Sequence, residues 1–102
     1  LYTDPDFELE KYMDEAMLSP LYESEDYQGV RDVLAIIHDA SIIKKFIDAM
    51  KSRKIILADG HHRYEGSLFY KHQQKQQNPN HTGNEGYNFL LMYLTNTEAD
   101  DL

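Results

Sequence analysis

Three segments of the chain carry apolar side chains at helical spacing. In residues 6–18, in residues 40–51 and from His61 to about Gln77, apolar positions recur three and four residues apart, as on one face of a helix. An acidic residue and a proline, Asp4 and Pro5, precede the first segment and form a common helix-start signal. The pattern therefore predicts three helices, the third with a polar, exposed end.

Three other segments are centred on apolar runs and predict strands. They are residues 30–38, 54–58 and 87–96. A run without polar alternation is typical of a strand that is covered on both faces. Residues 1–3 look like a further strand that is cut short, whereas the acidic segment 21–29 and the polar segment 78–86 read as turns and loops.

Helices and strands thus alternate in the order αβαβαβ. Alternation of this kind favours an α/β fold built in layers, with an α+β fold as the alternative. No internal repeat or linker divides residues 1–102, so we expect one domain. Because the chain begins at Leu1 without a leader-like segment, we alternatively interpret it as the central fragment of a longer protein.

The composition is globular and acidic. The chain is 41% hydrophobic and carries a net charge of −8, which disfavours nucleic acid and anionic membranes as partners but leaves room for a small anion in a local pocket. It has no cysteine, which excludes disulfides, thiolate zinc sites and thiol nucleophiles and agrees with a cytoplasmic location. No apolar run approaches the roughly 20 residues that span a bilayer.

The segment 54–77 combines a predicted strand, a glycine turn and a predicted helix. Gly60 permits close approach of a ligand to the backbone, and the first helical turn offers free N–H groups and the positive end of the helix dipole. Arg63 adds a planar set of donors that matches phosphate, and His61 and His62 can donate as well. These cationic residues are unfavourable at a helix N-terminus unless an anion binds there, so we predict a phosphate site at Gly60–Arg63.

Asp59 and Glu65 are the acidic residues of this segment. Asp59 stands where a helix cap belongs, and its alternative roles are Mg²⁺ binding or general-base catalysis. Glu65 shares a helix face with either His61 or His62, an arrangement that would also suit a transition metal. We expect the remaining histidines and aromatic side chains to be structural: His38, His72 and His81, with Tyr64, Phe69, Tyr70 and Tyr93 in the core rather than stacked on a base.

The block from Leu57 to Glu65, with the sequence Leu-Ala-Asp-Gly-His-His-Arg-Tyr-Glu, resembles the hallmark of the domain of unknown function 1015 family. The segment 87–96 resembles that family's next strand, and the resemblance covers roughly residues 28–102. Members of the family are longer than this chain, which agrees with a central fragment. Asp32 and Ala35 depart from the family pattern, so the resemblance does not support a role for the strand near residue 30.

That family is in turn similar to the ParB/sulfiredoxin-like superfamily, which implies a mixed sheet with flanking helices. In that superfamily a Gly-x-x-Arg element after a strand binds nucleotide phosphates, and Gly60–Arg63 matches it. Sulfiredoxin-like members carry a reactive cysteine where His61 stands, so their chemistry is not expected. ParB-type members bind CTP and DNA, and another branch is similar to free-serine kinases.

We therefore expect a nucleotide-dependent phosphotransferase or hydrolase that uses ATP or another nucleotide, Mg²⁺ and a small-molecule acceptor. In this hypothesis Gly60, His61, His62 and Arg63 hold the phosphates, Asp59, His62 and Glu65 act in catalysis, and Asp59 or Glu65 holds Mg²⁺. The alternatives are a nucleotide-sensing module without chemistry, a metal-assisted hydrolase and a purely structural helix start. An unpaired strand edge would also allow a homodimer.

Overall fold

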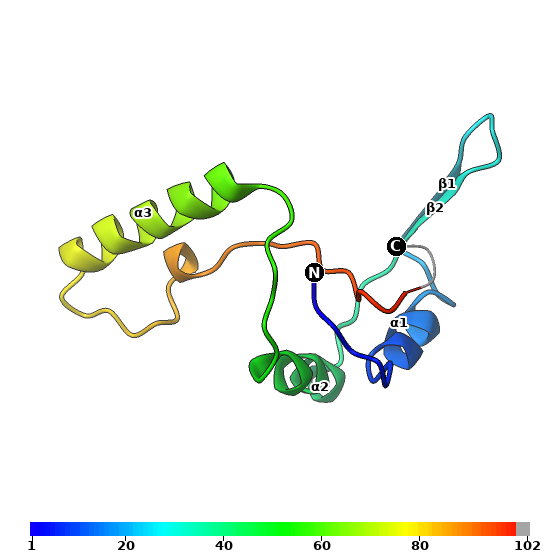
Figure 1. Cartoon of the computed structure of the whole chain (residues 1–102), viewed down its shortest axis with the longest axis horizontal. Helices are drawn as coiled ribbons and strands as arrows, with labels where there is room; N and C mark the ends of the chain where they lie inside the picture. The colour runs from blue at the N-terminus through cyan, green and yellow to red at the C-terminus, as the bar shows by residue number, and fades with distance from the viewer. Residues whose placement is uncertain (100–102) are drawn as a thin grey trace. The chain divides into compact units, whose positions relative to one another are not determined.

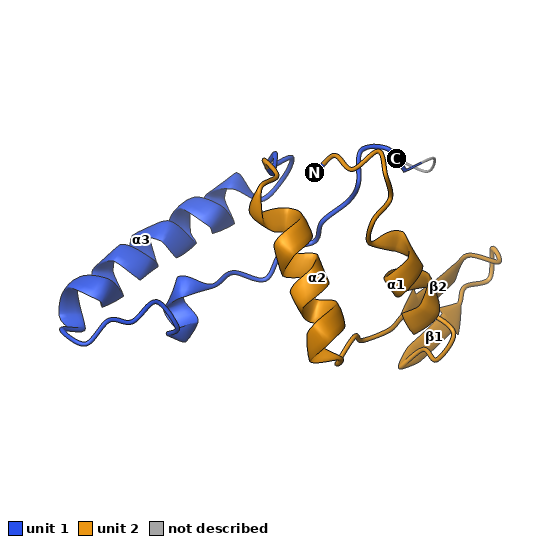
Figure 2. Ribbon diagram, turned by 90° about the horizontal axis from the view of Figure 1, so that it is seen from below, with its two compact units in different colours: residues 1–2, 55–102 blue, residues 3–54 orange. Residues whose placement is uncertain are grey.

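The computed structural model describes residues 1–99 of the chain and shows a mixed α/β fold (Figure 1). Along the chain, the order of elements is α1, β1, β2, α2, α3 and the short 3₁₀ helix η1. The chain divides into two compact units: unit 2 is residues 3–54, and unit 1 combines residues 1–2 with the described residues from Ile55 onward (Figure 2). The predicted α/β class is confirmed, whereas the predicted alternation of single helices and strands is wrong.

Helix α1, Glu10–Ala16, opens unit 2 and is shorter than the predicted helix over 6–18. Phe7 has a φ of 50°, a left-handed value that an α-helix does not contain, so the helix begins only after it. The carboxylate of Asp4 accepts the backbone N–H groups of Asp6 at 3.1 Å and Glu8 at 2.8 Å. The prediction that Asp4 and Pro5 start the helix directly is therefore wrong: Asp4 organises a turn, and the N-cap residue of α1 is Leu9.

Strands β1, Tyr22–Glu25, and β2, Arg31–Leu34, form an antiparallel hairpin in unit 2. Asp26 holds its turn by accepting the N–H groups of Gln28 at 2.8 Å and Val30 at 3.0 Å. The acidic segment 21–29 was predicted as a turn and instead contains β1, because a strand pairs through its backbone whatever the charge of its side chains. The predicted strand over 30–38 ends at Leu34, and Leu34 is exposed rather than covered on both faces.

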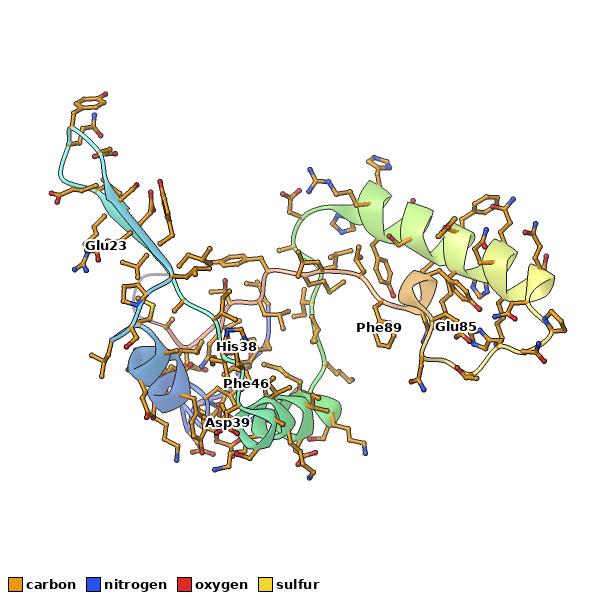
Figure 3. All side chains as sticks on the ribbon, turned by 180° about the vertical axis from the view of Figure 1, so that it is seen from behind. Glu23, His38, Asp39, Phe46, Glu85 and Phe89 are labelled. Atoms are coloured by element: carbon orange, nitrogen blue, oxygen red, sulfur yellow. The ribbon has the colours of Figure 1, made fainter. Side chains whose placement is uncertain are left out.

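Helix α2, Ala40–Lys51, has the bounds that the sequence predicts. Asp39 caps it by accepting the Ser41 N–H at 2.8 Å and the Ser41 hydroxyl at 2.6 Å (Figure 3). The Ser41 hydroxyl and the nearby N–H groups lower the pKa of the Asp39 carboxyl. The ring of Phe46 on α2 lies 6.3 Å from the ring of Tyr12 on α1.

Unit 1 contains α3, His61–Gln77, and η1, Gly86–Asn88. The helix matches the prediction, and the loop between the two elements is held by its own polar side chains. Glu85 accepts the Thr82 N–H at 2.8 Å and the Gly83 N–H at 3.0 Å. Hydrogen bonds, the one from the Thr82 backbone first among them, lower the pKa of Glu85 to about 2. The Tyr87 hydroxyl lies 2.6 Å from His81 Nδ1, so His81 has a structural partner here.

The strands predicted over 54–58 and 87–96 are not formed in this structure. Leu1 and Ile56 exchange two backbone hydrogen bonds, at 2.7 and 2.8 Å, and Tyr2 forms an isolated parallel bridge with Asn96. The predicted strand 1–3 is thus reduced to single residue pairs. A strand needs a neighbour along its length, and each apolar segment meets residues 1–2 at one point only.

Candidate functional site

Gly60 is the N-cap of α3 and adopts a left-handed conformation, with φ 80° and ψ 29°. This backbone geometry favours glycine even though a Cβ here would meet no atom within 4 Å. Asp59 Oδ1 accepts the Gly60 N–H at 2.8 Å, and no side chain in the described part of the chain caps the helix. The expectation that Asp59 caps the first turn of α3 is therefore wrong, because its carboxylate serves the residue before the helix.

A cavity of about 400 Å³, which we call the α3 cavity, opens beside this helix start within unit 1. Asp59, Gly60, Arg63, Tyr64 and Thr95 contribute to its lining, and residues 55–58 and 90–94 form its apolar wall. Cavities of this size are typical of small-molecule sites, which combine a mostly apolar wall with a few polar groups. The α3 cavity is therefore suited to a ligand with a polar end and an apolar end.

Arg63 and the helix start favour an anion at the polar end of the α3 cavity, and the Asp59 carboxylate in the same lining opposes it. Arg63 takes no part in the ion pairs found among residues 1–99, and the first turn of α3 contains no acidic residue. The free N–H groups and the dipole of the helix add partial positive charge at the same end. An anion at this point would offset the unfavourable placement of Arg63 beside a helix N-terminus.

The structure separates the predicted site residues into two groups. Asp59, Gly60 and Arg63 line the α3 cavity, whereas His61, His62 and Glu65 are exposed and line none of it. Helix geometry explains the division, because residues three and four apart share a face: Gly60 with Arg63 and Tyr64, and Glu65 with His61 and His62. The structure therefore does not bring His61, His62 or Glu65 to the cavity lining.

The metal interpretation finds limited support. Among residues 1–99, no group of three or more His, Asp or Glu side chains is placed to hold a metal ion, so the transition-metal site at His61, His62 and Glu65 is not formed. Asp59 is the carboxylate of the α3 cavity. One carboxylate together with phosphate oxygens is a common environment for Mg²⁺, so Asp59 remains a candidate for a Mg²⁺ ion carried by a nucleotide.

A second, wider cavity of about 730 Å³ lies beside α3 and η1, and we call it the α3–η1 groove. Arg63 lines both cavities, and Gly66, Tyr70 and Phe89 line the groove alone. Sequence reasoning missed this groove and placed Tyr70 in the core, but Tyr70 is 52% exposed. The other aromatic residues predicted for the core are also exposed: Tyr64, Phe69 and Tyr93. The available signal was Gly66, a glycine inside the predicted helix from His61 to about Gln77.

The remaining histidines do not add to either cavity. His38 and His72, both expected to be structural, are exposed. His81 lies in the loop before η1, as predicted, and contacts Tyr87 there with their rings 5.6 Å apart. No helix in the described part of the chain has the length and apolar character needed to cross a membrane.

The model of one protein family matches the whole chain, residues 1–102, and the family is described as "Protein of unknown function (DUF1015)". The chain belongs to this family, which confirms the resemblance carried by residues 57–65 and extends it to the N-terminal part. No curated protein and no solved structure matches the chain. The link to the ParB/sulfiredoxin-like superfamily therefore stays a prediction.

Proposed function

We propose that this member of the DUF1015 family binds the phosphate groups of a nucleotide at the polar end of the α3 cavity. The observation that carries the proposal is the position of Arg63, which lines the cavity beside the α3 N-terminus without an ion pair among the described residues. A guanidinium group and helix N–H groups are the donors that proteins most often direct at phosphate. The left-handed Gly60 leaves the approach to these donors open.

The reaction that this arrangement would support is phosphoryl transfer to a small-molecule acceptor or to water. Such reactions depend mainly on positioning and on neutralising phosphate charge, which Arg63 and the helix N-terminus would supply. When bound, Mg²⁺ would neutralise further phosphate charge, and Asp59 would hold it. His62 and Glu65 would reach only a substrate that extends beyond the cavity, because neither lines it.

A nucleotide-sensing module without chemistry is the second candidate. One observation favours it: of the proposed catalytic residues, only Asp59 lines the α3 cavity. Binding would then change how the protein assembles or contacts its partners, and phosphate would not be transferred. Phosphorus NMR of the protein with ATP, Mg²⁺ and candidate acceptors separates the two candidates, because only the enzyme forms a product.

The phosphate site is tested by calorimetric titration of the full-length protein with tripolyphosphate and with ATP. Arg63→Ala should weaken binding of both by about tenfold or more, the usual contribution of a charged hydrogen bond. Arg63→Lys keeps the charge but loses the planar arrangement of donors, so it should restore only part of the affinity. Arg31→Ala, an exposed arginine on β2, is the matched control. Unchanged affinity in Arg63→Ala would refute the proposal.

A further inference from the structure

The α3–η1 groove contains two glycines that its own structure does not explain. Gly66 lies inside α3 and Gly86 begins η1, and neither has a positive φ. A Cβ on either residue would meet no atom within 4 Å. Glycine inside a helix lowers stability relative to alanine. Neither the backbone conformation nor packing among the described residues therefore requires glycine at these positions. Close approach of a bound ligand to the backbone would require it.

Three aromatic residues line the same groove: Tyr70, Tyr87 and Phe89. Tyr70 comes from α3 and Phe89 directly follows η1, where Figure 3 labels it. Tyr70 is 52% and Phe89 65% exposed, so much of each ring is free for contact. A groove lined by glycines and exposed rings is shaped for a flat aromatic group, which stacks on such rings without needing directed hydrogen bonds.

Arg63 connects the groove to the proposed phosphate site because it lines both cavities. A ligand with phosphate against Arg63 can therefore extend a ring system along α3 toward Gly66 and Tyr70. We infer that the α3–η1 groove holds the base of the nucleotide whose phosphates occupy the α3 cavity. This inference rests on the proposed function and adds that the base is held on the groove side of Arg63, not against residues 91–94, which line the α3 cavity but not the groove.

Aromatic residues on the two sides of Arg63 provide the test. Phe89 lines only the groove, and Tyr93 lines only the α3 cavity, within the same segment of the chain. ATP and CTP should each bind the full-length protein more tightly than tripolyphosphate does. Phe89→Ala should lower the affinity for whichever nucleotide binds more tightly by about tenfold, as loss of one stacking contact does. It should leave the affinity for tripolyphosphate unchanged. Phe69→Ala, a control outside both cavities, should change neither.

Gly66→Ala separates ligand binding from packing. The added methyl group should raise the melting temperature, because alanine is the better helix former, and should weaken nucleotide binding by narrowing the groove. Thermal melting and titration of the same variant measure the two effects, and their opposite signs exclude simple loss of structure. A Gly66→Ala protein that melts earlier and binds nucleotide normally would show a packing surface and overturn the inference.

The titrations distinguish failure of this inference from failure of the proposed phosphate site. Equal binding of tripolyphosphate and both nucleotides would overturn the groove assignment and leave the phosphate site standing. If Tyr93→Ala lowers the nucleotide affinity and Phe89→Ala does not, the base lies in the α3 cavity and the groove assignment is overturned in the same way. If neither tripolyphosphate nor nucleotide binds, both proposals are overturned.

Discussion

The Arg53 guanidinium joins the beginning of unit 2 to the end of α2. Its Nη2 lies 3.1 Å from Asp4 Oδ1, and the Asp4 side chain is 1% exposed. Arg53 also donates to the backbone carbonyls of Thr3 at 3.2 Å and Ala49 at 2.5 Å. Replacing Arg53 with methionine keeps most of the volume but removes the guanidinium group beside the buried Asp4 carboxylate.

The expected destabilisation follows from these contacts. Removing one partner of a buried ion pair lowers the free energy of unfolding by about 3–5 kcal/mol, largely because the other charge stays buried. Asp4 retains its hydrogen bonds from the N–H groups of Asp6 and Glu8, which favours the lower end of that range. We therefore expect the free energy of unfolding of Arg53→Met to be about 3 kcal/mol below that of the unchanged protein. Arg53→Lys should lose less, because it keeps the charge.

Guanidinium-induced unfolding of the full-length protein, followed by circular dichroism, measures the loss. Lys44→Met is the control, because the Lys44–Asp48 pair is 2.9 Å long but 75% and 57% exposed, and such pairs contribute about 0–1 kcal/mol. In an Asp4→Asn background, Arg53→Met should lower the free energy of unfolding by less, since the buried carboxylate charge is then absent. The reasoning is refuted if Arg53→Met lowers the free energy of unfolding no more than Lys44→Met does, or lowers it equally in the Asp4 and Asp4→Asn backgrounds.

Two further predictions concern unit 1. The folded state lowers the pKa of Glu85 from 4.5 to about 2, so Glu85 should stabilise the protein above pH 4.5 and lose that contribution as the pH falls toward about 2. Glu85→Gln should therefore flatten the pH dependence of the melting temperature between these values, and an unchanged profile would contradict the assignment. Asp59→Asn should strengthen tripolyphosphate binding without Mg²⁺, by removing a like charge, and should abolish any gain from added Mg²⁺ in the same titration. Persistence of that gain would show that Asp59 does not hold the metal.

Local signals in the sequence were sufficient for the helices. Asp39 and Gly60 mark the starts of α2 and α3 through interactions within a few residues, so both helices could be placed from the sequence. Strands depend on a partner that lies elsewhere in the chain. The apolar run around Leu91 reads as a covered strand, but Leu91 is 98% exposed, because nothing within its own segment determines pairing.

The candidate site shows the same contrast between features set by neighbouring residues and features set by distant ones. The turn from Asp59 to Gly60 and the donor at Arg63 were predictable, because glycine, helix start and arginine are neighbours in sequence. Which face of α3 lines a cavity depends on residues 90–95, some thirty positions away, so the sequence could not separate Arg63 from His62. The α3–η1 groove was missed for the same reason.

The pairing of Tyr2 with Asn96 also bears on the order in which the protein forms during synthesis. All of unit 2 lies between Thr3 and Lys54, so its contacts are available as soon as that stretch has left the ribosome. Tyr2 donates its N–H to the Thr95 carbonyl, and its own carbonyl accepts the N–H of Thr97. These hydrogen bonds of unit 1 cannot form until residues 95–97 have been translated. The α3 cavity includes Leu1 and Thr95 and would therefore be completed late, after the helix that carries Arg63 has already formed.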